Sequence, residues 1–395
     1  MVSARKVAEL STVSTCNCLL ADCSTVYGNK VDFIAGCYEL ILDSDGSVDM
    51  GYRGSVNGYA LEHENTNKYS LNKVTSTTTD SVTDILPGIF DLTCCSDGVH
   101  LMTSCTDGAV RLFGFEEGFL KESVYPVHNT MLTSCSPFYL SGGEMVTKAK
   151  WLCTAHQGAV LVYDAITMNV VCNLEGHDYD AWCSATIDTE ISLSGGDDGL
   201  LKWWDLRSDS KAIRKMQFGA GVVSIAPVTE GGVATTLSLV GSYDEHLYIV
   251  DSRLPKEPLT SINLGGGVWR CSRQLFREGL PSESKTSMEH YGWVHPSNVL
   301  AIPVMQRGVA LVSYNINASE ENMTTLLGYL HNEKNHSEED GLPENALFYD
   351  SAVLHRGFTC DTNTDIHDDT ATVVTCDFYN KKVALWNVEG ILPPA

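Results

Sequence analysis

The stretch EISLSGGDDGLLKWWDLR, residues Glu190–Arg207, decides the fold. A short apolar run leads into the tight turn GGDDG at 195–199, and a second apolar run, Leu200–Trp204, follows it. Two β-prone segments around an Asp-Gly turn predict a β-hairpin. The ending Trp204-Asp205, with Gly176-His177 upstream, is typical of one blade of a WD-repeat propeller.

Within such a blade, polar side chains are expected to form an internal hydrogen-bonded chain. The residues predicted for this structural role in the quoted blade are His177, Ser194, Asp198 and Trp204. Asp244 follows the next strand pair at the same place as Asp198, so we give it the same structural role. The other blades are weaker copies of this one.

The composition agrees with one large repeat fold. The chain has 395 residues, of which 43% are hydrophobic and 19% are charged, and 33 glycines suit many short strands and turns. Lys and Arg total 26 and Asp and Glu total 50, so the net charge is 26 − 50 = −24. This acidity argues against binding to a phosphate backbone and favours cationic surfaces or ligands as partners.

The cysteines and the apolar runs indicate the compartment. None of the 14 cysteines forms a C-x-x-C pair, so neither a zinc ribbon nor a thioredoxin-like site is supported. The first residues contain no apolar run of signal-peptide length, and no segment approaches the roughly 20 apolar residues that a membrane span needs. We therefore expect a cytoplasmic monomer with reduced thiols, no membrane contact, no metal and no cofactor.

The repeats predict an all-β protein, a single seven-bladed WD-repeat propeller over residues 1–395, with six or eight blades as alternatives. Residues 3–12 are expected to complete the last blade and close the ring. Some hairpin turns are 63 or 73 residues apart, longer than the repeat of roughly 40–45, which indicates insertions. The segments interpreted as loops or insertions are 55–84, 277–298 and 331–344, and 55–84 is expected to be mostly a loop, with one edge strand as the alternative. Ser47–Tyr52 is then the third strand of blade one.

Catalytic signatures are absent from the sequence. It contains no G-x-S-x-G, H-E-x-x-H, Walker loop or G-x-G-x-x-G. Pattern alone therefore predicts a noncatalytic WD-repeat adaptor or scaffold that binds other proteins, although fold does not imply function.

Four motifs in order carry a more specific resemblance: GHDYDAW at 176–182, SGGDDGLLKWWDLR at 194–207, GSYDEH at 241–246 and GGGVWR at 265–270. Together they resemble the diphthine methylesterase family of WD-repeat proteins, also called diphthine methyltransferases. The resemblance implies a carboxyl methylesterase of diphthamide biosynthesis. Such an enzyme hydrolyses the methyl ester of methylated diphthine on elongation factor 2 and releases methanol, so elongation factor 2 is the implied partner.

The chain departs from the family pattern in two places. Met305-Gln306-Arg307-Gly308 stands where the family often has Met-His-x-Gly, and Tyr349-Asp350-Ser351-Ala352-Val353 stands where it often has Tyr-Gly-x-Asp-Trp. A catalytic role of that His or Asp therefore does not transfer to Gln306 or Ala352.

The repeat also predicts which side chains lie at the mouth of the central channel. The residue before the structural Asp of each turn points outward on one face, and in blades two to five it is Thr106, His156, Asp197 and Tyr243. Trp182 and Trp269 each start an innermost strand and should line the same mouth.

Ester hydrolysis needs an activated water or nucleophile and stabilisation of an oxyanion. In the predicted site His156 is the general base, and Asp197 orients either this base or the substrate. Arg270 or backbone N–H groups hold the oxyanion. Direct attack by water and a covalent intermediate both remain open, because a triad is spatial and cannot be identified by spacing.

The implied substrate carries a trimethylammonium group, which proteins recognise with aromatic faces and nearby carboxylates. We therefore predict an aromatic-acidic pocket on blades four to six. Its predicted substrate-binding residues are Trp182, Tyr243, Trp269, Asp178 and Glu245. The alternative is that both tryptophan rings pack under the strands and only Tyr243 is exposed.

Overall fold

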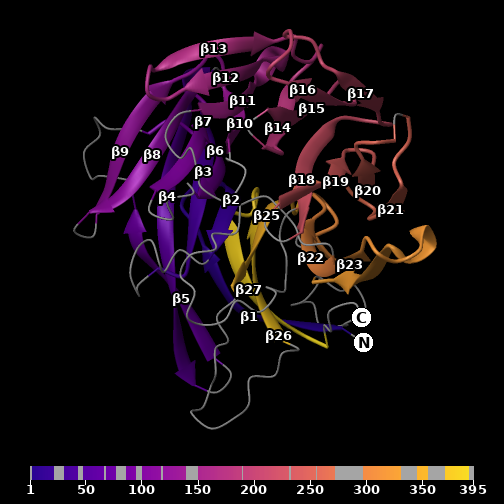
Figure 1. Ribbon diagram of the computed structural model, residues 1–395. Helices are drawn as coiled ribbons and strands as arrows, with labels where there is room; N and C mark the ends of the chain where they lie inside the picture. Colours follow the sequence, from indigo (N-terminus) through magenta and orange to yellow (C-terminus); the bar gives the residue numbers. More distant parts are fainter. Residues whose placement is uncertain are drawn as a thin grey trace.

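The computed structural model describes residues 2–21, 31–42, 48–65, 68–76, 86–94, 100–116, 119–138, 150–188, 190–230, 233–254, 256–271, 297–330, 345–354 and 370–390. Seven antiparallel sheets stand around one axis and form a seven-bladed β-propeller (Figure 1). The fold class predicted from the sequence is confirmed. None of the described helices is long and apolar enough to cross a membrane.

The first three blades are four-stranded meanders with the innermost strand first. Blade one holds β2 (Cys16–Ala21), β3 (Phe33–Leu42), β4 (Val48–Asn65) and β5 (Lys68–Ser76). Blade two holds β6 (Ile89–Cys94), β7 (His100–Cys105), β8 (Ala109–Glu116) and β9 (Phe119–Pro126). Blade three holds β10 (Leu132–Pro137), β11 (Lys150–Ala155), β12 (Val160–Asp164) and β13 (Asn169–Leu174), with the 3-10 turn η1 (His156–Gly158) between β11 and β12.

Blades four and five continue the same order. Blade four holds β14 (Ala181–Thr186), β15 (Ile191–Gly196), β16 (Leu200–Asp205) and β17 (Arg214–Gln217). Blade five holds β18 (Val222–Glu230), β19 (Val233–Ser242), β20 (His246–Asp251) and β21 (Thr260–Asn263). Blade six holds β22 (Ser297–Pro303), β23 (Val309–Asn315) and β24 (Thr324–Tyr329), with the 3-10 turn η2 (Glu320–Asn322) before β24. In blade six the innermost position belongs to the segment around Trp269, whose amide donates to the Pro303 carbonyl, so the three assigned strands of this blade are its second, third and fourth.

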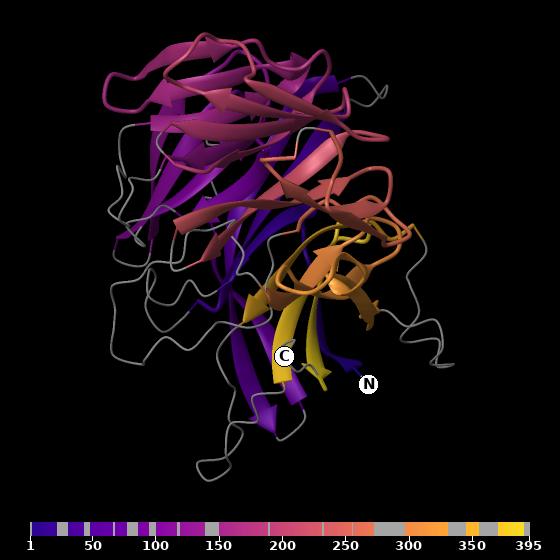
Figure 2. The same cartoon turned by 45° about the vertical axis from the view of Figure 1, so that its right-hand side comes forward.

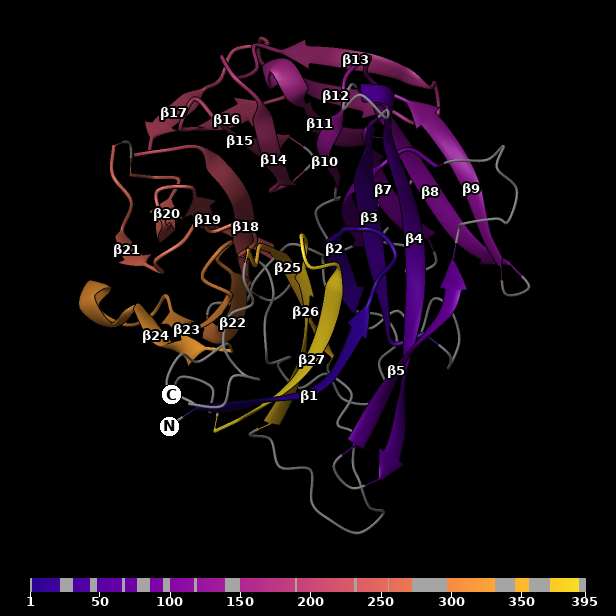
Figure 3. The same cartoon turned by 180° about the vertical axis from the view of Figure 1, so that it is seen from behind.

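Blade seven closes the ring with strands from both ends of the chain. It holds β25 (Phe348–Leu354), β26 (Thr370–Asp377), β27 (Lys382–Glu389) and, outermost, β1 (Ser3–Ser11). Strand β1 pairs antiparallel with β27 from Ser3 opposite Glu389 to Ser11 opposite Lys382. The expected closure by residues 3–12 is thus present, and the start of β1 lies beside the end of β27 (Figures 1 and 3).

Apolar side chains fill the space between neighbouring blades. Met102 and Val110 of blade two pack with Trp151 and Tyr163 of blade three, and all four are at most 2% exposed. Each sheet therefore buries its faces only against its neighbours, which makes the ring one cooperative unit.

Blade one differs from the prediction, which ended its third strand at Tyr52 and read 55–84 mostly as a loop. Strand β4 continues to Asn65, and β5 follows as the outermost strand. The two strands extend past the rest of the ring (Figures 2 and 3). Polar residues form a strand here because they satisfy one another: Asn57 donates to Ser55 Oγ at 2.9 Å and accepts from the Ser76 hydroxyl at 2.8 Å.

The other two predicted insertions fall largely outside the described residues. Residues 277–296 and 331–344 are not among them, and strand β22 begins at Ser297, so the last two residues of the first predicted insertion belong to a strand.

In blade four a chain of hydrogen bonds links the loop before β14, strands β15 and β16, and the turn between these two strands. His177 Nδ1 lies 2.9 Å from Asp198 Oδ1, and His177 Nε2 lies 2.7 Å from Ser194 Oγ. The Trp204 indole N–H donates to the same Ser194 hydroxyl at 2.9 Å. Blade seven keeps half of this chain, since the Trp386 indole donates to Thr375 Oγ1 at 3.1 Å.

The turn aspartates of blades two, four and five share one geometry with different partners. Each contacts the side chain four residues further along: Asp107 pairs with Arg111 at 2.7 Å, Asp198 with Lys202 at 3.6 Å, and Asp244 accepts from the Tyr248 hydroxyl at 2.8 Å. The blades are therefore weaker copies in sequence but equivalent in how the turn is held.

Burial sets the protonation state of the blade-four chain. Burial lowers the pKa of His177 below 6.5, although Asp198 partly opposes this. Burial raises the pKa of Asp198, whereas the hydrogen bond from His177 lowers it, and the pKa falls to about 2. A neutral imidazole therefore donates from Nδ1 to an ionised carboxylate and accepts at Nε2 from the Ser194 hydroxyl.

Asp198→Ala should lower the free energy of unfolding by about 1–3 kcal/mol, because it leaves the buried His177 imidazole without its acceptor. Asp197→Ala removes the neighbouring, exposed carboxylate and should cost much less. Chemical denaturation of both variants measures the difference. Equal losses would contradict the assignment of an inward and an outward aspartate.

The stability margin of the wild type over His177→Asn should shrink as the pH falls from 7.5 to 5. The pKa of His177 is lowered in the folded state, so below about pH 6.5 the unfolded chain takes up a proton that the folded chain does not. The stability that neutral His177 contributes is therefore lost in this window. Denaturation midpoints of both proteins across the pH series test this, and a margin that stays constant or grows would refute it.

Candidate active site

The innermost strands of the ring share one irregularity near their start. In six blades the register with the second strand shifts by one residue, which leaves a bulged residue between the first and third positions. The bulged residues are Asn17, Phe90, Thr133, Trp182, Val223 and Tyr349. In blade six Trp269 takes this place, where its amide donates to the Pro303 carbonyl at 3.3 Å. A bulge re-aims its side chain.

The bulged aromatic residues meet in one cluster. Trp269 is at its centre, with ring centroids 5.7 Å from Trp182, 4.9 Å from Tyr349 and 6.4 Å from Phe90. Two further residues join them: Tyr243, from the turn before β20, is 5.8 Å from Trp269, and Tyr38, in strand β3, is 5.8 Å from Phe90. We call these six residues the aromatic lid: Tyr38, Phe90, Trp182, Tyr243, Trp269 and Tyr349.

The turn residues that the sequence predicted to point outward occupy equivalent places. The backbone N–H groups of Thr106, Asp197 and Tyr243 each donate to a carbonyl just before the innermost strand of the same blade, at 2.8–2.9 Å. The His156 amide does the same with Met131, at 3.0 Å. Their side chains consequently surround the start of the innermost strands, where the lid lies.

His156 has a carboxylate neighbour, but it is Asp180 rather than the predicted Asp197. His156 Nδ1 lies 3.6 Å from Asp180 Oδ2, and the other Asp180 oxygen accepts from the Gln157 backbone N–H at 2.8 Å. Nε2 of His156 is buried and has no hydrogen-bond partner in the described part of the chain. Its ring meets Trp182 edge-on, 5.6 Å between centroids.

Asp197 instead holds the lid. Its Oδ1 accepts the indole N–H of Trp182 at 2.6 Å. Burial raises the pKa of Asp197, and the charges of Asp180 and Asp198 raise it further, against the bond from Trp182. Three carboxylates thus lie close together beside Trp182, and they give this edge of the lid a negative potential.

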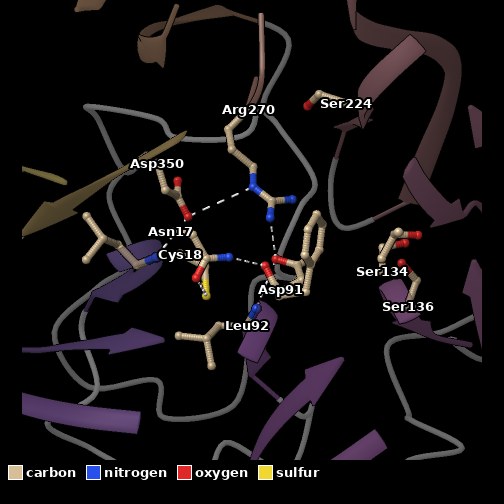
Figure 4. Close-up of polar contacts among 12 residues, drawn as sticks. Asn17, Cys18, Asp91, Leu92, Ser134, Ser136, Ser224, Arg270 and Asp350 are labelled. Atoms are coloured by element: carbon tan, nitrogen blue, oxygen red, sulfur yellow. Dashed lines mark hydrogen bonds and ion pairs between the residues drawn. The ribbon is translucent and has the colours of Figure 1, made fainter. Parts of the chain in front are cut away.

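Arg270, the predicted oxyanion donor, is hydrogen-bonded to one carboxylate and lies at the outer limit of ion-pair distance from a second. Its Nη2 donates to Asp91 Oδ1 at 2.6 Å, and its Nε lies 4.0 Å from Asp350 Oδ2 (Figure 4). Burial lowers the pKa of Arg270, but the charges of Asp91 and Asp350 outweigh it and raise the value. Asp91, Arg270 and Asp350 form what we call the ionic layer, one residue past the bulge in blades two, six and seven.

The predicted substrate-binding residues are brought together only in part. Trp182, Tyr243 and Trp269 lie in one cluster, but Trp269 is only 8% exposed, whereas Trp182 and Tyr243 are half-buried. The side chains of Asp178 and Glu245 are exposed on the adjoining turns.

The two departures from the family pattern leave no acid or base at either place. Gln306 is exposed in the turn that precedes β23, and Ala352 is 1% exposed within the core of β25. Asp350 is fully buried, accepting the backbone N–H groups of Leu19 and Ser351 at 2.9 and 2.8 Å.

Sequence reasoning missed the residues that only the bulge brings to the axis, namely Phe90, Asp91 and Tyr349, together with Asp180. The available signal was the repeat position itself. Trp182 and Trp269 had been placed at the start of their strands, and the same offset in blades two and seven gives Phe90 and Tyr349.

The thiols near the axis are not activated. Burial raises the pKa of Cys18 well above its usual value, and the charges of Asp91 and Asp350 add to this. Burial also raises the pKa of Cys183. A protonated thiol is a poor nucleophile. Within the described ranges, no group of three or more His, Cys, Asp or Glu side chains is arranged to hold a metal ion.

The comparisons with known proteins agree with this picture of a WD-repeat propeller. No family model matches the chain. It is 36% identical over 115 residues to diphthine methyltransferase of Homo sapiens, which covers 28% of this chain and only 24% of that protein's length. It is 26% identical over 325 residues to diphthine methyltransferase of Schizosaccharomyces pombe, covering 78% of this chain and 83% of the relative.

Two further matches define the limits of the likeness. A diphthine methyltransferase homolog of Dictyostelium discoideum is 34% identical over 120 residues, 26% of this chain and 31% of that protein. Among solved structures, a chain of the mitotic checkpoint complex superposes with a TM-score of 0.56 over 96% of this chain and 91% of that one. Its sequence is 12% identical, so it shows the fold alone. The chain is thus similar to diphthine methyltransferases over most of its length at 26% identity, and at 34–36% identity over a shorter segment that spans less than a third of each of those relatives.

Proposed function

We propose that this protein acts in diphthamide biosynthesis, in the cytoplasm, as a carboxyl methylesterase. Its substrate is the methyl ester of methylated diphthine on elongation factor 2, and its products are methanol and diphthine. The observation that carries the proposal is the half-buried Trp182 ring, which lies between His156 and Asp197 at the edge of the aromatic lid. One place thus combines a base, a carboxylate and an aromatic face.

The lid suits a quaternary ammonium group. Such a cation donates no hydrogen bond, so it is bound by aromatic faces within roughly 6 Å and by nearby negative charge. Trp182 and Tyr243 are two of the four half-buried rings of the lid, beside Tyr38 and Tyr349, and Trp269 packs against Trp182 and Tyr243 and fixes their spacing. Asp180 and Asp197 supply the negative charge beside them, with Asp178 and Glu245 on the adjoining turns.

His156 is the proposed general base and Asp180 its orienting carboxylate. A water molecule attacks the ester carbonyl carbon, and His156 Nε2 accepts the proton that the water loses. The tetrahedral intermediate then expels methoxide, which takes the proton from His156 and leaves as methanol; the carboxylic acid that remains loses its own proton to solvent and becomes the carboxylate. This role would give the buried Nε2 of His156 a hydrogen-bond partner, namely the attacking water.

Direct attack by water fits better than a covalent intermediate. A nucleophilic hydroxyl or thiol would lie within hydrogen-bond distance of its base, and none does so at His156 Nε2 among the described residues. Arg270 is engaged by Asp91 one position past the lid. We therefore propose backbone N–H groups rather than Arg270 as oxyanion donors.

Purified wild-type protein should release one methanol per methylated diphthine and remove one methyl mass from elongation factor 2. His156→Gln should lower kcat by at least about a hundredfold, since general base catalysis contributes roughly 10²–10⁴. Methanol release and intact-protein mass spectrometry measure both.

His246→Gln is the matched control, because His246 directly follows a hairpin turn as the first residue of β20, lies 3.5 Å from a carboxylate of Asp244 and has nearly the same exposure as His156, 33% against 34%. Its kcat should stay within about twofold. If the protein binds elongation factor 2 stably but removes no methyl mass from it, the esterase hypothesis fails and the adaptor hypothesis takes its place.

Glu245→Gly should hold or raise stability, by up to about 1 kcal/mol, while weakening binding of the modified factor. Glu245 has φ 72°, in a turn position where Gly108, Gly158 and Gly199 stand in other blades. A residue with a side chain is strained in this backbone conformation. Its presence at this position therefore indicates a functional role for the Glu245 side chain.

Glu245→Gln separates the two effects, because it removes the charge and keeps the backbone strain. Its melting temperature should match that of the wild type while its KM rises as in Glu245→Gly. A KM unchanged in both variants would remove Glu245 from the site.

A further inference from the structure

The aromatic lid and the ionic layer are joined by the chain itself. Each member of the ionic layer directly follows a lid aromatic: Phe90-Asp91, Trp269-Arg270 and Tyr349-Asp350. Ring contacts and charge contacts run in parallel through the same blades. Trp269 touches both Phe90 and Tyr349, and Arg270 bridges Asp91 and Asp350. A movement of one layer must therefore move the other.

The ionic layer spans blades that are far apart in the chain. Arg270 and Asp91 are 179 residues apart and join blade six to blade two, while Asp350 belongs to blade seven. Figure 4 shows the guanidinium reaching between the two carboxylates, with Ser134 and Ser224 on the far side. The side chains are 15% exposed for Arg270, 17% for Asp91 and 0% for Asp350.

Stability alone explains this layer poorly. Desolvating buried charges costs about as much as their attraction returns, so apolar residues of the same size often serve equally well. The same position in blades three and five holds Ser134 and Ser224, after Thr133 and Val223, which are not aromatic. Charge thus occurs where an aromatic ring precedes it.

Blade four is the one bulge at which an aromatic residue is followed by an uncharged one, Trp182-Cys183. In blade four the Trp182 ring is restrained from the side of the hairpin turn, because Asp197 accepts the hydrogen bond of the Trp182 indole N–H. Every aromatic ring at a bulge position is therefore held by a charged group: three through the next residue in the chain and one directly.

We propose that Asp91, Arg270 and Asp350 are positioning residues, which fix Phe90, Trp269 and Tyr349 and so hold the lid in the shape that binds a quaternary ammonium. The identity of this ligand rests on the proposed function, whereas the restraint of the rings does not. The ionic layer acts through the lid and touches no reacting atom.

The main test is Asp91→Asn, which keeps the shape of the side chain and removes its charge. Tryptophan emission should change, because Trp269 loses its fixed environment. The same substitution on a Trp269→Phe background should change it far less. The Kd for tetramethylammonium and the KM for the modified factor should each rise by about fivefold or more, and kcat should change less than KM. Asp91→Glu should recover part of the affinity, and Ser134→Ala, at the same place in blade three, should match the wild type.

Asp91→Asn leaves Arg270 short of one partner, so the double variant with Arg270→Gln covers a failure to fold. A folded single or double variant with unchanged tryptophan emission and unchanged tetramethylammonium affinity would overturn the proposal. The proposal would also be overturned by a variant that loses stability but keeps the tryptophan emission and the tetramethylammonium affinity of the wild type. If the wild type shows no esterase activity but the variants still shift the emission, the positioning role stands and the proposed reaction falls.

Discussion

A single backbone constraint, the β-bulge near the start of the innermost strands, determines what lies at the centre of this propeller. Without the extra residue, Phe90, Trp182 and Tyr349 would keep the strand's alternation and pack between blades. With it, six blades turn one side chain each toward the axis. Because the bulge recurs at one level, the rings meet in a layer and the charges that follow them meet in the next.

The parts of the structure that sequence could predict are those encoded locally. Trp204, Ser194, His177 and Asp198 lie within 28 positions of one another in a repeat whose spacing fixes their contacts. Blade one was harder to predict because β4 and β5 are rich in Ser, Asn and Thr, whose strand is made by mutual hydrogen bonds such as that of Asn57 with Ser76. The contact of Arg270 with Asp91 has no local signal, since it depends on ring closure and on two bulges.

The site combines two ways of holding an aromatic ring. At the edge, Asp197 accepts a hydrogen bond from Trp182 in a half-exposed setting, where Asp180 and Asp198 also lie close by. Toward the axis, burial and ion pairing act together on the neighbours of Trp269, Phe90 and Tyr349. The first arrangement leaves a ring face toward solvent and charge beside it, whereas the second gives a firm support behind it. A large cation that donates no hydrogen bond can be selected only by the shape of its site and by the electrostatic potential there. Its recognition therefore needs both arrangements of the aromatic rings.

The pairing of β1 with β27 determines when the ring can close during synthesis of the protein. During synthesis β1 emerges before every other described strand, yet its only partner strand in the described sheet lies more than 370 residues later. Blades one to six can assemble against one another as they appear, but β1 must wait as an unpaired strand until β27 is made. Closure of the ring therefore depends on a contact between the first and the last described strands, of the non-local kind that forms slowly. A nascent chain held on the ribosome has an open ring, and a chaperone that shields β1 would act at the point of greatest exposure.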